Sequence, residues 1–146
     1  MLNDLFSCPI EVRYGDLDPQ GHVNNAKFLT YFEQARINYF VHLGLLNKTQ
    51  AFLDVGIIVA DIQATFLAPV LFGYEVRVGV RVTRLGNKSL TVTYRMVESA
   101  SGVELATGSS VLVTFDYHKN ETVPIPDVWR EKISAFEGLD QNKINT

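Results

Sequence analysis

The segment Tyr14-Gly-Asp-Leu-Asp-Pro-Gln-Gly-His-Val-Asn-Asn25 separates a strand-like beginning from a long apolar stretch, and this transition decides the fold. Its glycines and its proline favour turns and keep the segment out of regular structure. Asn24 or Asn25 is suited to cap a following helix, because an asparagine side-chain oxygen accepts a hydrogen bond from a free N–H of the first turn. The segment therefore combines two carboxylates, a histidine and free backbone donors, which together suit acyl transfer.

Residues 26–43 predict one long helix that is apolar over most of its circumference. A narrow polar stripe is left, formed by Lys27, Thr30, Gln34 and Asn38 and bordered by Glu33. Gly44 is expected to end the helix, since a left-handed residue at that place costs glycine little. A helix with so few polar positions must be covered by other elements, and the rest of the chain is expected to wrap around it.

The rest of the chain predicts mainly strands with an apolar and a polar face. Strands are expected over residues 6–14, 55–66, 74–83, 89–96 and 104–117. Gly86-Asn87 predicts a hairpin turn, and the small residues Ala106, Gly108 and Ser110 predict a close approach of a neighbouring element. A short helix capped by Asp127 is expected to reach about Phe136. The layout is an α+β fold with a five-stranded antiparallel sheet around one helix.

Length and composition indicate a single domain, residues 1–146, with a polar tail from about residue 137. The formal net charge is −3 and no basic run is present, which argues against nucleic acid as a partner. Cys8 is the only cysteine, so an intramolecular disulfide and a four-thiolate metal site are excluded. No signal peptide and no membrane span are expected, and we predict a cytoplasmic protein without metal or redox cofactor.

The segment of residues 14–25, with Phe28-Leu-Thr-Tyr-Phe-Glu-Gln-Ala-Arg36 after it, resembles the signature of the 4-hydroxybenzoyl-CoA thioesterase family of hotdog-fold proteins. The resemblance is closest to the bacterial acyl-CoA thioesterase branch. Plant acyl-carrier-protein thioesterases, with their Asp-x-x-x-His-Val-Asn-Asn segment, are also similar. The order of elements matches over essentially the whole chain. The resemblance implies a hotdog fold and hydrolysis of an acyl-CoA thioester to free acid and CoA.

Within this resemblance, Asp18 matches the catalytic carboxylate, which attacks the thioester carbonyl or activates a water molecule. The backbone N–H of Asn25 matches the donor to the thioester oxygen, helped by the positive end of the helix dipole. The alternative interpretation is that Asp18 only closes an Asx-turn before Pro19. The residues by themselves leave both interpretations open.

His22 matches a histidine that plant acyl-carrier-protein thioesterases use, whereas the founding hydroxybenzoyl enzymes lack one. It either orients Asp18 or a water, protonates the leaving thiolate, or is a loop histidine bonded to backbone. Asp16 is expected to be a loop or capping acid. Glu33 matches the position of a catalytic acid in another hotdog branch, but its spacing from Arg36 favours a surface pair.

The turn Gly86, Asn87, Lys88 and Ser89 matches a segment that approaches the nucleotide or pantetheine arm of CoA in similar proteins, and its amides and lysine suit phosphates. An ordinary solvated turn is the alternative. Exposed sheet edges favour a homodimer or a tetramer (a dimer of dimers), with the strand 55–66 pairing with its symmetry mate. The family resemblance implies an active site shared between two chains.

Three other functions remain open. An acyl-carrier-protein thioesterase is excluded by no residue. A hotdog enoyl-CoA hydratase normally carries an Asp-x-Asn-Pro-x-His motif, whereas this loop has Pro19-Gln-Gly21 at another spacing. A non-catalytic acyl-CoA-binding protein would keep the pocket and need an attached regulatory segment.

Overall fold

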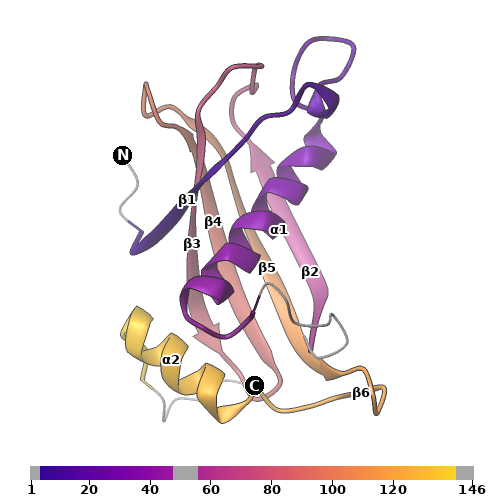
Figure 1. Cartoon of the computed structure of the whole chain (residues 1–146), viewed down its shortest axis with the longest axis vertical. Helices are drawn as coiled ribbons and strands as arrows, with labels where there is room; N and C mark the ends of the chain where they lie inside the picture. Colours follow the sequence, from indigo (N-terminus) through magenta and orange to yellow (C-terminus); the bar gives the residue numbers. More distant parts are fainter. Residues whose placement is uncertain (1–3, 48–55, 141–146) are drawn as a thin grey trace. The chain divides into compact units, whose positions relative to one another are not determined.

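The computed structural model describes residues 4–47 and 56–140. Figure 1 shows the elements along the chain. They are the strand β1 (Phe6–Ile10), the 3-10 helix η1 (Tyr14–Asp16), the helix α1 (Asn25–His42), the strands β2 (Ile57–Phe66), β3 (Val76–Leu85), β4 (Ser89–Glu98), β5 (Glu104–Asp116) and β6 (Glu121–Thr122), and the helix α2 (Asp127–Glu137).

The strands follow the order β1-β3-β4-β5-β2, with β6 paired to β5. β1 is antiparallel to β3, and Phe6 lies opposite Val80. The predicted α+β class and the hairpin at Gly86 are confirmed, since the Gly86 N–H donates to the Ser89 carbonyl at 2.7 Å. In residues 4–47 and 56–140 the sheet has six strands and not the five that we expected. The two-residue β6 is too short to leave a period-two pattern in the sequence.

The described chain is organised in two compact units. Of the described residues, unit 1 comprises 4–39, 63–80 and 94–108, and unit 2 comprises 40–47, 56–62, 81–93 and 109–140. The helix α1 and the strands β2 to β5 each contribute residues to both units. A single domain over residues 1–146 stays a prediction.

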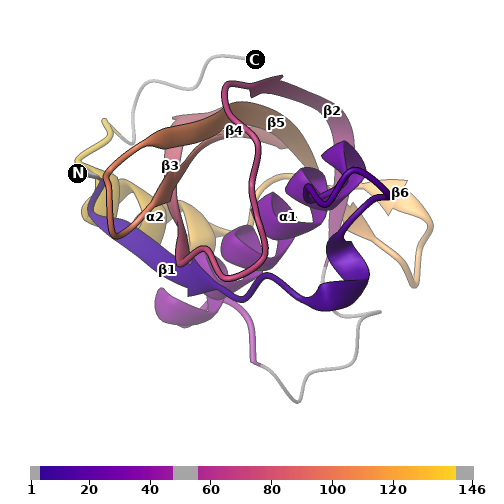
Figure 2. The same ribbon diagram turned by 90° about the horizontal axis from the view of Figure 1, so that it is seen from above.

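In unit 1, α1 packs closely against β4 and β5 (Figure 2). The Phe32 ring stacks on Tyr94, with ring centroids 4.7 Å apart. Gly108 faces the same phenylalanine, and a Cβ there would come within 2.6 Å of the Phe32 ring and 2.9 Å of the Gln63 carbonyl oxygen. The close approach predicted at the small residues of this strand is confirmed.

In unit 2, α2 is held by contacts at both of its ends. Trp129 lies against Phe40 with ring centroids 5.3 Å apart, and the Glu137 carboxylate accepts from the Val82 N–H at 2.8 Å. The N-cap is Pro126, so Asp127 is the first helical residue and not the cap that we expected. Its charge still lies at the positive end of the helix.

The first strand is shorter than predicted. It ends at Ile10, whereas the alternation of the sequence continues to Tyr14. Tyr14 begins η1 and is 75% exposed. The Asp16 carboxylate accepts from the Arg13 backbone N–H at 3.1 Å and thereby turns the chain away from the strand.

The boundaries of the long helix are close to the prediction. It spans Asn25–His42, one residue earlier at each end than expected. Gly44 has a φ of 74° and donates to the Val41 carbonyl, which confirms it as the residue that ends the helix. Of the strand predicted over 55–66, residue 55 lies outside the described residues.

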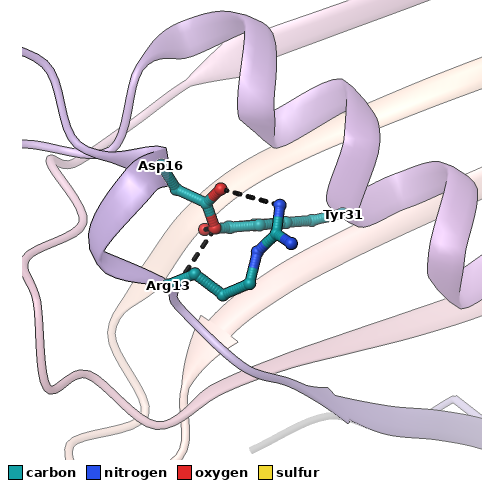
Figure 3. A network of polar contacts seen from close by, with 3 residues as sticks. All are labelled: Arg13, Asp16 and Tyr31. Atoms are coloured by element: carbon teal, nitrogen blue, oxygen red, sulfur yellow. Dashed lines mark hydrogen bonds and ion pairs between the residues drawn. The ribbon is translucent and has the colours of Figure 1, made fainter.

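A buried carboxylate fixes the loop that leads into α1. Asp16 is 1% exposed. It accepts from the Tyr31 hydroxyl at 2.7 Å and from the Arg13 backbone N–H, with the Arg13 guanidinium 3.4 Å away (Figure 3). The Arg13 side chain is largely exposed, which makes the ion pair weak compared with the buried hydrogen bonds.

These bonds keep Asp16 ionised. Burial opposes the charge and raises the pKa of Asp16, but the hydrogen bonds from Tyr31 and Arg13 and the Arg13 charge outweigh it, so the pKa lies below its ordinary value. The pKa of Tyr31 is raised, first by burial and then by the Asp16 hydrogen bond and charge. At neutral pH Tyr31 is therefore a neutral donor to an Asp16 anion.

Asp16→Asn should destabilise the protein in a pH-dependent way. The pKa of Asp16 is lower in the folded chain than the unfolded value of about 3.9. The ionised carboxylate therefore stabilises the fold above about pH 4, and this contribution is lost as the pH falls through the folded pKa. We expect a loss of about 2 kcal/mol at pH 7, typical of hydrogen bonds to a charged group, and a smaller loss at pH 3.

Urea unfolding of both proteins at pH 7, 5 and 3 measures this difference. Glu131→Gln, an exposed acid on α2, is the control and should change stability by less than about 0.5 kcal/mol. An equal loss for Asp16→Asn at all three pH values would show that the Asp16 charge is not the stabilising feature.

Candidate active site

The loop between η1 and α1 folds back on itself like a very short hairpin. Leu17 and Val23 form an isolated β-bridge. Inside it, the Asp18 N–H donates to the His22 carbonyl at 2.8 Å, and the Gly21 N–H donates to the Asp18 carbonyl at 3.0 Å. Gly21 has a φ of 81°, a left-handed conformation that favours glycine at the tip. The loop therefore presents Asp18 and His22 as neighbours.

The Asp18 carboxylate uses one oxygen for the loop. Its Oδ1 accepts from the Gln20 N–H at 2.9 Å and from the His22 N–H at 3.3 Å. This is the Asx-turn that the sequence left as an alternative. Its Oδ2 accepts no hydrogen bond from the described part of the chain, so a structural and a chemical role are compatible in one side chain.

The helix start places a backbone donor beside this acid. Asn24 is the cap, because its Oδ1 accepts from the Ala26 N–H at 2.9 Å. Asn25 is the first residue of α1, and its N–H has no acceptor within the helix. Of the two asparagines that suited capping, the structure uses Asn24 for the cap, which leaves Asn25 in the position of a donor.

Asp18, His22 and Asn25 line one open cavity of about 480 Å³ in unit 1. The structure thus brings together the three residues that we predicted to be catalytic. Gln20 and Asn24 complete its polar lining, and its apolar lining, called the apolar wall below, is formed by Val23, Phe28, Phe66, Leu67, Ala68 and Pro69. A lining of both kinds can hold a polar group and an apolar chain of one ligand.

The residues of the apolar wall were not predicted from the sequence. Phe66 meets Phe28 edge to face, with ring centroids 5.1 Å apart, and it is 44% exposed. The Val23 N–H donates to the Val70 carbonyl at 2.8 Å and holds the end of the loop near this segment. The only signal in the sequence was the interruption of the strand pattern after Phe66.

The predicted CoA-binding turn lies in unit 2, whereas Asp18 lies in unit 1. Lys88 at its tip is exposed, with its Nζ 3.5 Å from the Thr122 hydroxyl. Arg130 of α2, which the sequence analysis did not single out, donates to the Gly86 carbonyl at 2.7 Å and brings a second cation to the turn. Binding of CoA by Gly86, Asn87, Lys88 and Ser89 stays a prediction.

Other titratable residues are placed away from this cavity. Glu33 does not line it and pairs with Arg36 at 3.7 Å on α1. The spacing predicted this pair, but Arg36 is buried, so it is not the surface pair that we expected. Residues 4–47 and 56–140 contain no group of three or more metal-binding side chains. They also contain no helix that is long and apolar enough to cross a membrane.

Comparison with known proteins gives consistent matches over most of the chain. The model of the thioesterase-like superfamily matches residues 12–133. The chain is 31% identical over 128 residues to the uncharacterized protein YsmA of Bacillus subtilis strain 168, covering 88% of this chain and 84% of that one. It is 25% identical over 99 residues to the acyl-CoA thioester hydrolase YbgC of Escherichia coli O6:H1, covering 68% and 74%.

A solved structure agrees with these matches. A thioesterase from Thermus thermophilus, crystallised in complex with coenzyme A and Zn, is similar with a TM-score of 0.79 and 38% identity, covering 92% of this chain and 95% of that one. The predicted hotdog fold is confirmed. The chain belongs to the thioesterase-like superfamily and is a hydrolase that acts on thioesters.

Proposed function

We propose that the protein hydrolyses an acyl-CoA thioester to a free acid and CoA, with Asp18 as the catalytic carboxylate. The observation that carries this proposal is that Asp18 and Asn25 line the same cavity, and that Asp18 Oδ2 accepts no hydrogen bond from the described residues. Similar proteins support CoA as the carrier, since one is an acyl-CoA thioester hydrolase and another was crystallised with coenzyme A.

The geometry supplies the two groups that thioester hydrolysis requires. Asp18 either takes a proton from a water that attacks the carbonyl carbon, or attacks that carbon itself to give a mixed anhydride that water then hydrolyses. The negative charge that develops on the carbonyl oxygen is stabilised by the Asn25 N–H. The C–S bond then breaks, and the CoA thiolate leaves and takes up a proton. A preorganised donor of this kind contributes about 3–4 kcal/mol in the transition state.

The apolar wall suits the acyl group. Phe28, Phe66 and Leu67 offer a hydrophobic surface in the same cavity as the polar residues, and a cavity of about 480 Å³ lies within the usual range for small-molecule sites, about 300–1,000 Å³. Assignment to the 4-hydroxybenzoyl-CoA branch and a cytoplasmic location remain predictions. A hydrolysis panel of aromatic, short, medium and long acyl-CoAs, with acyl-carrier-protein substrates beside them, identifies the acyl group and the carrier.

The strand β2 supports a dimer. It is the last strand in the sheet order, and among the described strands only β5 lies beside it. Several of its apolar residues are exposed: Ile58, Val59, Ile62 and Phe66. An exposed apolar edge strand is normally paired or covered. We propose that two copies pair through β2 and that their active sites are shared.

Asp18→Asn should lower kcat by at least about a hundredfold, because it removes both the nucleophile and the base. The fold should change little, since the asparagine Oδ1 can still accept the bonds that close the loop. Steady-state hydrolysis of the best substrate measures the effect. Glu33→Gln is the control for the other candidate acid and should retain near-normal activity, while near-normal turnover by Asp18→Asn would refute the proposed mechanism.

His22→Gln distinguishes an acid–base role from a loop role. The backbone N–H and carbonyl of His22 hold the loop in either variant, so the substitution changes mainly the ring in the cavity. We expect a loss of about tenfold or more in kcat, together with a changed pH–rate profile, if the ring acts as an acid or a base. An unchanged pH–rate profile would assign His22 to the scaffold.

Mixed dimers test the shared site. Chains with Asp18→Asn and chains with Lys88→Ala should each be weak alone. Mixed, they should regain about half of the native activity per heterodimer, because one site then combines an intact Asp18 with an intact Lys88 from the partner.

The matched control reverses the expectation. Here a chain carrying both substitutions is mixed with the unmodified chain. If each site combines residues of two chains, the heterodimer has no intact site. If each site is built from one chain alone, the heterodimer has one intact site. Half-activity in this control and none in the first mixture would exclude the shared site, and so would a protein that is monomeric at working concentration.

A further inference from the structure

We propose that the buried hydrogen bond from Tyr31 to Asp16 positions the Asp18 loop for catalysis, so that Tyr31 and Asp16 are positioning residues for thioester hydrolysis. This inference rests on the proposed role of Asp18. Neither residue lines the cavity, so they act through the loop and not on the substrate.

Asp16 holds both ends of the loop. It precedes Leu17 and Asp18 directly, and its carbonyl accepts from the N–H of Asn24 at 2.9 Å. Residues 17–23 therefore form a loop whose two ends meet at Asp16. Any displacement of Asp16 moves Asp18 on one side and the helix cap Asn24 on the other.

Tyr31 connects the closed end of this loop to α1. Its hydroxyl donates to Asp16 Oδ2 at 2.7 Å across a sequence separation of 15 residues, as Figure 3 shows. Tyr31 lies six residues after Asn25, which corresponds to about 9 Å along a helix. The positions of the Asp18 carboxylate and of the Asn25 N–H are thus both fixed relative to α1. Asp18 is fixed through the loop, and Asn25 is fixed because it is the first residue of the helix.

Besides its internal bonds, the loop is held at its far end by the bond from the Val23 N–H to the Val70 carbonyl and by an isolated β-bridge between His22 and Leu71. Pro19, Gln20 and Gly21 at its tip are exposed, and Asp18 and His22 are only half-buried. The Arg13 side chain that also reaches Asp16 is 68% exposed. Tyr31 is the buried side-chain donor to Asp16 in the described residues, and hydrogen bonds to an ionised acceptor are the strong ones.

Small displacements in this loop should be costly for the reaction and not for binding. A misplacement of about 1 Å at a reacting group can lower the rate by about a hundredfold, because near-attack geometry is lost. Removing one anchor leaves the backbone bonds of the loop in place, so a smaller effect is expected. We expect Tyr31→Phe to lower kcat by about tenfold and to change KM by less than about twofold.

Tyr94→Phe is the matched control. Tyr94 is also buried in unit 1, and its hydroxyl accepts from Arg36 Nη1 at 3.2 Å, again a hydrogen bond to a charged group. It does not line the cavity. Both variants keep the ring and lose one buried hydroxyl, so thermal unfolding should shift to a similar extent in both, while kcat should fall only in Tyr31→Phe.

A double substitution adds a second test. If the hydrogen bond is the cause, Asp16→Asn combined with Tyr31→Phe should lower kcat no further than the more severe single substitution, because both remove one interaction. Multiplying effects would show that the two residues act separately and would overturn the proposal. Equal kcat values for Tyr31→Phe and Tyr94→Phe would overturn it as well.

Asp18→Asn in the same assay separates this inference from the proposed function. If Asp18→Asn stays active, the mechanism itself fails. If Asp18→Asn is inactive and Tyr31→Phe turns over like its control, only the positioning role fails.

Discussion

The hydrogen bond between the Tyr31 hydroxyl and the buried Asp16 carboxylate is the interaction on which the site depends most. A carboxylate that is 1% exposed is costly unless its oxygens are satisfied, and the helix supplies the donor. The same residue turns the chain out of β1 and closes the loop at Asn24. One anion thus specifies where the strand stops, how the loop closes and where α1 begins.

The cavity follows from this arrangement. Because the loop satisfies its own backbone groups, Asp18 needs only one carboxylate oxygen to hold the turn. The helix start contributes an N–H that has no partner inside the helix. The apolar wall combines Val23 and Phe28 with residues 66–69, which come about forty positions later in the sequence. A thioester has the same two-sided character, with a polar carbonyl beside an apolar chain.

Much of the fold was predictable because its elements carry strong local patterns. The period-two alternation of β3 and β4 matches side chains that the structure buries on one face. Gly44 has the left-handed conformation expected of a residue that ends a helix. The errors lie where tertiary contacts override local pattern. The alternation up to Tyr14 continues past the true end of β1, and β6 is too short to leave a signal.

For the site, the sequence by itself determined which groups are present: an acid, a histidine and a helix start within twelve residues. Their closeness in the chain allows a single short loop to bring them together. Only the tertiary structure decided that Asp16 is buried and bonded to Tyr31, and that Phe66 faces Phe28, because these pairs are separated by 15 and by about forty residues and no local pattern encodes them. Turns and helix ends can be predicted from neighbouring residues in the sequence, whereas contacts between residues that are far apart in the chain depend on how the elements pack.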